Sequence, residues 1–200
     1  MDESKDEDRI VGPKAELTRM FGTVAANDVF AICVDASDPA HPAGAATIFS
    51  GDNGTYSQAC RPFDAARLPA FARMLAAARA ALREACMIRG KQAREIYCLH
   101  PNRAQPGSPT SIDIEDARSH PGFLAEEGGF ATIAVPRGED RSDPLFAIYA
   151  DEGGGRAKRL WLGRVVWLSW LESLAASACK GRLGGGGALM SSGSEECATA

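Results

Sequence analysis

The segment Leu68–Ile88 most constrains the fold, because its apolar residues share one helical stripe while its arginines share the opposite side. This spacing predicts a long Ala/Leu-rich helix that needs an apolar surface to pack against. Pro69 fits such a helix only if the helix begins close to it. The apolar stripe consists of Leu68, Phe71, Leu75, Ala78, Leu82 and Cys86.

Short apolar runs before and after this helix have the length of β-strands. The runs before it are Val29–Val34, Ala45–Phe49 and Thr55–Cys60, and a Gly-Asp-Asn-Gly turn signal separates the last two. The runs after it are Glu95–Leu99, Phe130–Val135, Leu145–Ala150 and Ala157–Leu162. A short helix over 14–21 precedes these elements, and a helix over Arg164–Cys179 with Trp167 and Trp170 follows them. We therefore predict an α+β fold with an antiparallel sheet, in which both tryptophans pack into the core.

The two ends of the chain differ in composition from its middle. Residues 1–12 are mainly acidic and residues 181–200 are rich in Gly and Ser, so we expect flexible tails there. Residues 13–180 have the length of one domain, within which the proline-containing segment 100–129 is expected to be a long loop with one helical turn near Asp113–Ala117. Phe130-Ala131 repeats Phe30-Ala31, and Phe146–Tyr149 resembles Ala46–Phe49, in each case 100 residues later. A duplicated βββα unit is one interpretation of this offset.

The composition favours a soluble protein of the cytoplasm. No apolar run approaches the length of about 18 residues that a membrane helix needs. The first nine residues are acidic and lack the apolar stretch of a secretory signal. The six cysteines show no two-residue spacing of the kind that binds zinc, so we expect buried thiols and neither a metal nor a cofactor.

Charge is unevenly distributed along the chain. The formal net charge is −4, yet residues 61–94 carry a local charge of +6 and residues 113–127 a local charge of −4. The basic stretch 61–94 suggests nucleic-acid binding, with Arg73, Arg79 and Arg83 as candidate phosphate contacts. No aromatic residue alternates with these arginines to stack on bases, so a solvated helix face is the simpler interpretation.

One acidic residue raises an enzymatic hypothesis. Asp35 ends a strand, and a strand with an aspartate, two more strands, a helix and a fourth strand is similar to the opening of the ribonuclease H fold. That resemblance implies further acids in the helix and after the fourth strand, which would hold two metal ions. Glu84 lies near the helix end, but Cys98–Asn102 lacks the second acid. A degenerate enzyme is therefore the third hypothesis, and we predict no catalytic residues.

The order of helix, three strands, long helix, strands and final helix is similar to class I chaperones of bacterial type III secretion. The resemblance covers residues 14–179 and includes the hairpin Leu145–Leu162 and the closing helix with Trp167 and Trp170. It implies a non-catalytic homodimer that holds a segment of a secreted effector. The longer chain, the segment 100–129 and the neutral body depart from the family pattern.

The main hypothesis is therefore a dimeric chaperone or adaptor that binds another polypeptide, with nucleic-acid binding as the alternative. The predicted partner-binding or dimer face is the apolar stripe of the long helix: Leu68, Phe71, Leu75, Ala78 and Leu82.

Overall fold

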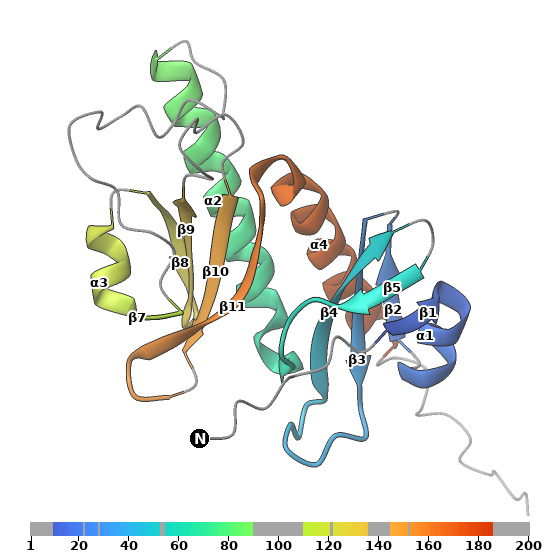
Figure 1. The fold of residues 1–200 in the computed structure, drawn as a ribbon. Helices are drawn as coiled ribbons and strands as arrows, with labels where there is room; N and C mark the ends of the chain where they lie inside the picture. Colours follow the sequence, from blue (N-terminus) through green and yellow to red (C-terminus); the bar gives the residue numbers. More distant parts are fainter. Residues whose placement is uncertain are drawn as a thin grey trace, which may run out of the picture.

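The computed structural model describes residues 10–21, 23–27, 29–52, 55–89, 110–120, 122–135, 145–151 and 153–185. It contains two antiparallel sheets and two long helices, which confirms the α+β class (Figure 1). The strand expected at Glu95–Leu99 lies outside the described residues.

Residues 10–89, the first half, form the first sheet and the first long helix. In order they are β1 (Ile10–Pro13), α1 (Lys14–Phe21), β2 (Thr23–Ala26), β3 (Phe30–Asp35), β4 (Ala45–Asp52), β5 (Thr55–Gln58), β6 (Phe63–Asp64), a 3-10 turn (Ala65–Arg67) and α2 (Leu68–Arg89). The order in the sheet is β1-β5-β4-β3-β2, with β6 also paired to β4. The three central strands form the antiparallel meander that the apolar runs predicted.

Residues 110–185, the second half, repeat this order of elements. They are β7 (Ser111–Asp113), α3 (Ile114–Ser119), β8 (Phe123–Glu127), β9 (Phe130–Val135), β10 (Leu145–Asp151), β11 (Arg156–Arg164), a 3-10 turn (Val165–Trp167) and α4 (Leu168–Gly185). The sheet order is β7-β11-β10-β9-β8. The register also corresponds, because Phe30 lies opposite Ser50 and Phe130 lies opposite Ala150. The order that the two halves share is longer than the predicted unit of three strands and a helix. That both halves descend from one duplicated unit stays a prediction.

Each long helix covers the sheet of the other half. Helix α2 packs on β8 and β9, α4 packs on β2 and β3, and the two helices pack on each other. Figure 1 shows the helix pair between the two sheets, with α1 and α3 on the outer sides. The two halves are therefore interlocked by a reciprocal exchange of helices.

Both faces of the central strands β3 and β10 are covered, which explains why these two strands are buried along their length and do not alternate. The inner faces and both long helices share one core, which includes Phe30, Ile48, Phe130 and Ile148. On the outer face of the first sheet, Leu17 of α1 packs with Ala31, Cys33, Phe49 and Tyr56. A corresponding outer cluster on the second sheet contains Ile133, Ala147, Tyr149 and Ala157.

Three boundary predictions need correction. The segment 100–129 is not a continuous loop, because β7, α3 and β8 lie in its second part, although α3 falls where one helical turn was expected. Strand β1 begins at Ile10 inside the expected acidic tail, since it pairs with β5. Helix α4 continues to Gly185, past the expected start of the glycine-rich tail.

The closing helix departs from the prediction in one side chain. Trp167 packs against the Phe30 ring as expected, with ring centroids 6.0 Å apart. Trp170 is 44% exposed and therefore lies at the surface. Among the described residues, no helix has the length and apolar character required to span a bilayer.

Candidate functional site

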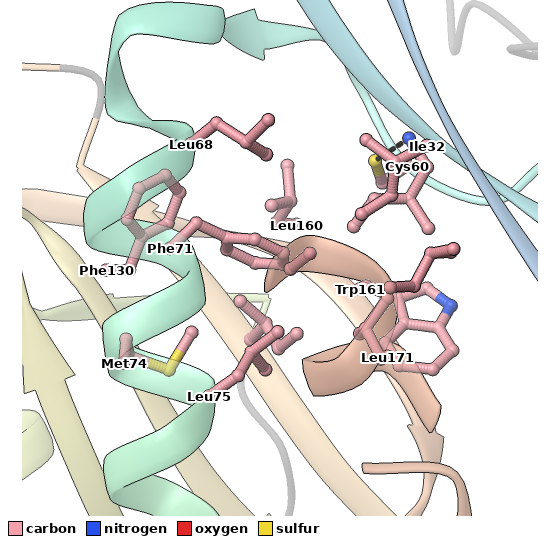
Figure 2. Close-up of a cluster of buried hydrophobic side chains, with 14 of the residues drawn as sticks. Ile32, Cys60, Leu68, Phe71, Met74, Leu75, Phe130, Leu160, Trp161 and Leu171 are labelled. Atoms are coloured by element: carbon pink, nitrogen blue, oxygen red, sulfur yellow. Dashed lines mark hydrogen bonds between the residues drawn. The ribbon is translucent and has the colours of Figure 1, made fainter. Parts of the chain in front are cut away.

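The apolar stripe of α2 faces the protein's own interior. Its five predicted partner-binding residues are between 0% and 6% exposed: Leu68, Phe71, Leu75, Ala78 and Leu82. Figure 2 shows Leu68, Phe71 and Leu75 of the stripe directed toward side chains of β11 and α4, including Leu160 and Leu171. The expectation of an open partner or dimer face here is therefore corrected, because the second half of the same chain already occupies that face.

The basic side of α2 also meets the second half. Arg73 donates to Glu127 of β8 at 2.9 Å, and Arg79 forms an ion pair with Glu172 of α4. Arg83 is exposed. Two of the three candidate phosphate contacts thus pair with carboxylates across the interface between the halves, so part of the basic block 61–94 is neutralised by the fold.

Asp35 organises a turn. Its carboxylate accepts hydrogen bonds from the Ser37 backbone N–H at 2.8 Å and from the Ser37 hydroxyl at 2.6 Å. These two hydrogen bonds hold the pKa of the Asp35 carboxyl below its usual value. Within the described ranges, no group of three His, Cys, Asp or Glu residues could hold a metal ion. The Glu84 side chain lies outside the described part of the chain.

Two cysteines are buried thiols. Cys33 lies under α1, and Cys60 lies in the shared core with its Sγ 3.2 Å from the Ile48 N–H. Burial raises the pKa of each thiol to about 12, because the thiolate would lose its hydration. The side chains of Cys86, Cys98 and Cys197 lie outside the described residues.

We expect Cys33 and Cys60 to resist alkylation in the folded protein. A pKa raised from 9.0 to about 12 lowers the thiolate fraction at neutral pH about 1000-fold, and only the thiolate reacts. Iodoacetamide labelling with peptide mass spectrometry, before and after addition of urea, measures this. Equal labelling rates of these two cysteines in both states would contradict their burial.

Arg67, the last residue of the 3-10 turn before α2, binds the second half. Its Nη1 donates to the Asp151 carbonyl at 2.9 Å, and its Nη2 donates to the carbonyls of Gly129 at 3.2 Å and Gly128 at 3.3 Å. The guanidinium lies 4.3 Å from the centroid of the Phe130 ring. We call this set of contacts the Arg67 clasp. It fixes the β8–β9 turn against the beginning of α2.

The corresponding position in the other half has different chemistry. Trp167 occupies the position that corresponds to Arg67, 100 residues later, and Phe30 corresponds to Phe130. Trp167 packs on Phe30 as Arg67 packs on Phe130. Trp161 packs edge-on against the same Phe30 ring, with centroids 5.2 Å apart, and is 8% exposed. Asn27 in the β2–β3 turn donates to the Trp170 carbonyl at 3.3 Å. Each helix start therefore binds the turn of the opposite half, through aromatic packing at one site and a guanidinium at the other.

Beside the Arg67 clasp lies a cavity of about 760 Å³ between the halves, which we call the cleft. Four basic side chains and two carboxylates line it, an excess of two positive charges with His41 neutral. The first half supplies Arg61, Asp64, Arg67 and His41, and the second half supplies Asp151, Lys158 and Arg159. Such a lining favours an anionic ligand.

Local structure places the basic groups in the cleft wall. Lys158 and Arg159 lie on β11, next to the bulge in its pairing with β10, and the Arg159 N–H donates to the Thr110 carbonyl at 2.9 Å. The Asp64 carboxylate accepts from the Ala66 N–H at 2.8 Å and so holds the 3-10 turn that presents Arg67. His41 Nδ1 lies 3.4 Å from an oxygen of Asp38.

Sequence reasoning did not find the cleft. Arg61 and Arg67 were counted within the basic block 61–94, but Lys158 and Arg159 were treated only as part of a strand. The available signal was the pair of adjacent basic residues directly before the apolar run Leu160–Leu162. The opposite side of the cleft comes from residues about 100 positions earlier in the sequence, such as Arg61 and Arg67. Local sequence patterns do not reveal that these residues lie near Lys158 and Arg159.

No family model matches the chain, and no curated protein or solved structure is significantly similar to it.

Proposed function

We propose that the chain is a non-catalytic binding protein that holds an acidic segment of a partner polypeptide in the cleft. The observation that carries this proposal is the convergence of four basic side chains from both halves on one cavity. The corresponding region of the other half contains Trp161 and Trp167 packed on Phe30. Of these two related regions, the cleft therefore carries charged groups around a cavity, whereas the other region is filled by aromatic rings. Charge complementarity would select the ligand of the cleft.

The architecture also supports an adaptor or chaperone. A class I secretion chaperone, which the sequence resembles, would bring two subunits together, whereas here one chain supplies two sheets and the helix pair between them. A dimer built through the α2 stripe would have to displace the chain's own core. We therefore propose that one chain is sufficient to form the binding site, with a cytoplasmic protein as its partner.

Fluorescence anisotropy with a short labelled peptide that alternates Glu and Thr tests this function, with a Lys/Thr peptide as the charge control. We expect the acidic peptide to bind more tightly and its affinity to fall with added salt. Lys158→Glu reverses an exposed charge in the cleft wall and is expected to weaken binding about tenfold.

Arg83→Glu makes the same charge change on the exposed side of α2, away from the residues that line the cleft. It should alter affinity for the acidic peptide by less than about threefold. Equal binding of the two peptides, or equal losses in the two variants, would overturn the proposal. A single-stranded oligonucleotide that binds more tightly than the peptide and responds to Arg83→Glu would instead support the nucleic-acid alternative.

A further inference from the structure

Strand β1 fixes the direction in which the chain enters the fold. It pairs antiparallel with β5, and Ile10 lies opposite Ser57. In an antiparallel pair, the residues before one strand run toward the residues after the other. Residues 1–9 therefore approach β1 from the side of residues 58–61. The same register, continued by four residues, would bring Asp6 level with Arg61, which lines the cleft.

The segment before β1 is long enough to enter the cleft. An extended chain advances about 3.3 Å per residue, so the four residues from Ile10 to Asp6 span about 13 Å. Residues 2–5 would continue beyond Arg61 for a further distance of about 13 Å. The opposite wall of the cleft, with Lys158 and Arg159, lies on that path because both residues line the same cavity as Arg61.

The charge of this segment is opposite to that of the cleft. Residues 1–9, which we call the acidic segment, hold five acidic and two basic side chains, a net charge of −3. The cleft has an excess of two positive charges. The corresponding segment before β7, residues 101–109, has Arg103 as its only charged residue. The acidic residues thus belong to the segment whose strand is directed toward the basic cleft.

The basic residues of the cleft already have partners within the chain. Arg61, Lys158 and Arg159 each take part in an interaction, and the Arg159 N–H also donates to Thr110. An external acidic ligand therefore has to compete with contacts of the chain itself. A segment joined to β1 has a high effective concentration at the cleft, because its tether is only a few residues long. These observations favour an occupant that belongs to the same chain.

Given the proposed function, we infer that the acidic segment binds in the cleft as an intramolecular competitor of the partner segment, with Asp6 beside Arg61. A partner binds only when the acidic segment leaves, so its apparent affinity is reduced by the fraction of molecules in which the cleft is open. The competition restricts the cleft to partners that bind it better than the chain's own acidic residues do.

The double variant Asp6→Asn/Asp8→Asn tests this inference in the full chain, because it removes two charges and preserves side-chain size. We expect it to bind the Glu/Thr peptide about fivefold more tightly than the wild type at low salt, since its competitor is weaker. The control Glu195→Gln/Glu196→Gln removes two acids near the other end of the sequence. It should change the affinity by less than about twofold.

Acetylation of Lys158 provides a second readout that needs no peptide. Lys158 is exposed in the cleft wall, and Lys180 is exposed on α4, away from the residues that line the cleft. Reaction with acetic anhydride, followed by peptide mass spectrometry, measures both rates. We expect Lys158 to react about threefold faster in Asp6→Asn/Asp8→Asn than in the wild type, because the acidic segment covers it less often. The rate of Lys180 should not change.

Unchanged peptide affinity and an unchanged Lys158 rate in Asp6→Asn/Asp8→Asn would overturn the inference, as would equal effects of the two double variants. The proposed function would then stand on the binding of the peptide. Absence of peptide binding by the wild type and both variants would overturn the proposed function instead, and the Lys158 rates would decide the inference by themselves.

Discussion

Phe71→Ala is expected to lower the free energy of unfolding by about 3–5 kcal/mol, because truncation of a buried aromatic side chain leaves a cavity. Phe71 is fully buried, and its ring centroid lies 5.3 Å from those of Phe63 and Phe130. The three rings join α2 to strands of both halves. Urea denaturation of the wild type and the variant measures the loss.

Trp170→Ala provides an aromatic control at the surface, since Trp170 is 44% exposed. We expect this variant to change stability by less than about 1 kcal/mol, because its side chain is not enclosed in the core. The difference between the two stability losses shows whether Phe71 on α2 belongs to the core, or whether it is a surface aromatic that could bind a partner. A loss of less than about 1 kcal/mol for Phe71→Ala would contradict the assignment of the stripe to the core.

Arg67→Ala is expected to lower the free energy of unfolding by about 2–4 kcal/mol, because it removes charged donors from three backbone carbonyls. The clasp joins α2 to Asp151, Gly128 and Gly129 of the second half. Arg67→Lys should lose nearly as much, since a single ammonium group lacks the planar fork that reaches all three carbonyls. Hydrogen exchange in the β8–β9 turn should accelerate in both variants.

Arg83→Ala is the matched control for the Arg67 variants, because it removes an exposed arginine from α2, the helix that begins directly after Arg67. Its effect should stay within about 0.5 kcal/mol. Full recovery of stability by Arg67→Lys would show that charge alone is sufficient and would contradict the geometric role of the guanidinium.

The sequence was informative where local pattern and burial coincide. The stripe of α2 and the apolar runs of β3, β4, β9 and β10 predicted their elements well, because the stripe is buried on one side of its helix and the runs lie in buried strands. Strand β8 was missed because Glu126 and Glu127 end it, and both pair with arginines outside the strand. Strand β1 was missed because its pairing partner, β5, lies more than 40 residues later in the sequence.

The arrangement of these elements depends on contacts that local patterns do not encode. An apolar stripe predicts burial but not what covers it, so the stripe of α2 was interpreted as a partner face. Likewise, the charge blocks 61–94 and 113–127 were separate observations in the sequence, whereas Arg73 and Glu127 bring them together in the fold. The cleft depends on the same long-range pairing of halves, which explains why only part of its lining was noticed.

The reciprocal exchange of helices is the central claim, because it creates both the core and the cleft, and a comparison of unfolding in the two halves tests it most directly. Hydrogen exchange of β9 and β10 at increasing urea concentrations follows the second half, because both strands belong to it. Hydrogen exchange of β3 and β4 at the same urea concentrations follows the first half. Interlocked halves predict coincident transitions with one midpoint. Two separate midpoints would contradict the exchange and, with it, a cleft built from both halves.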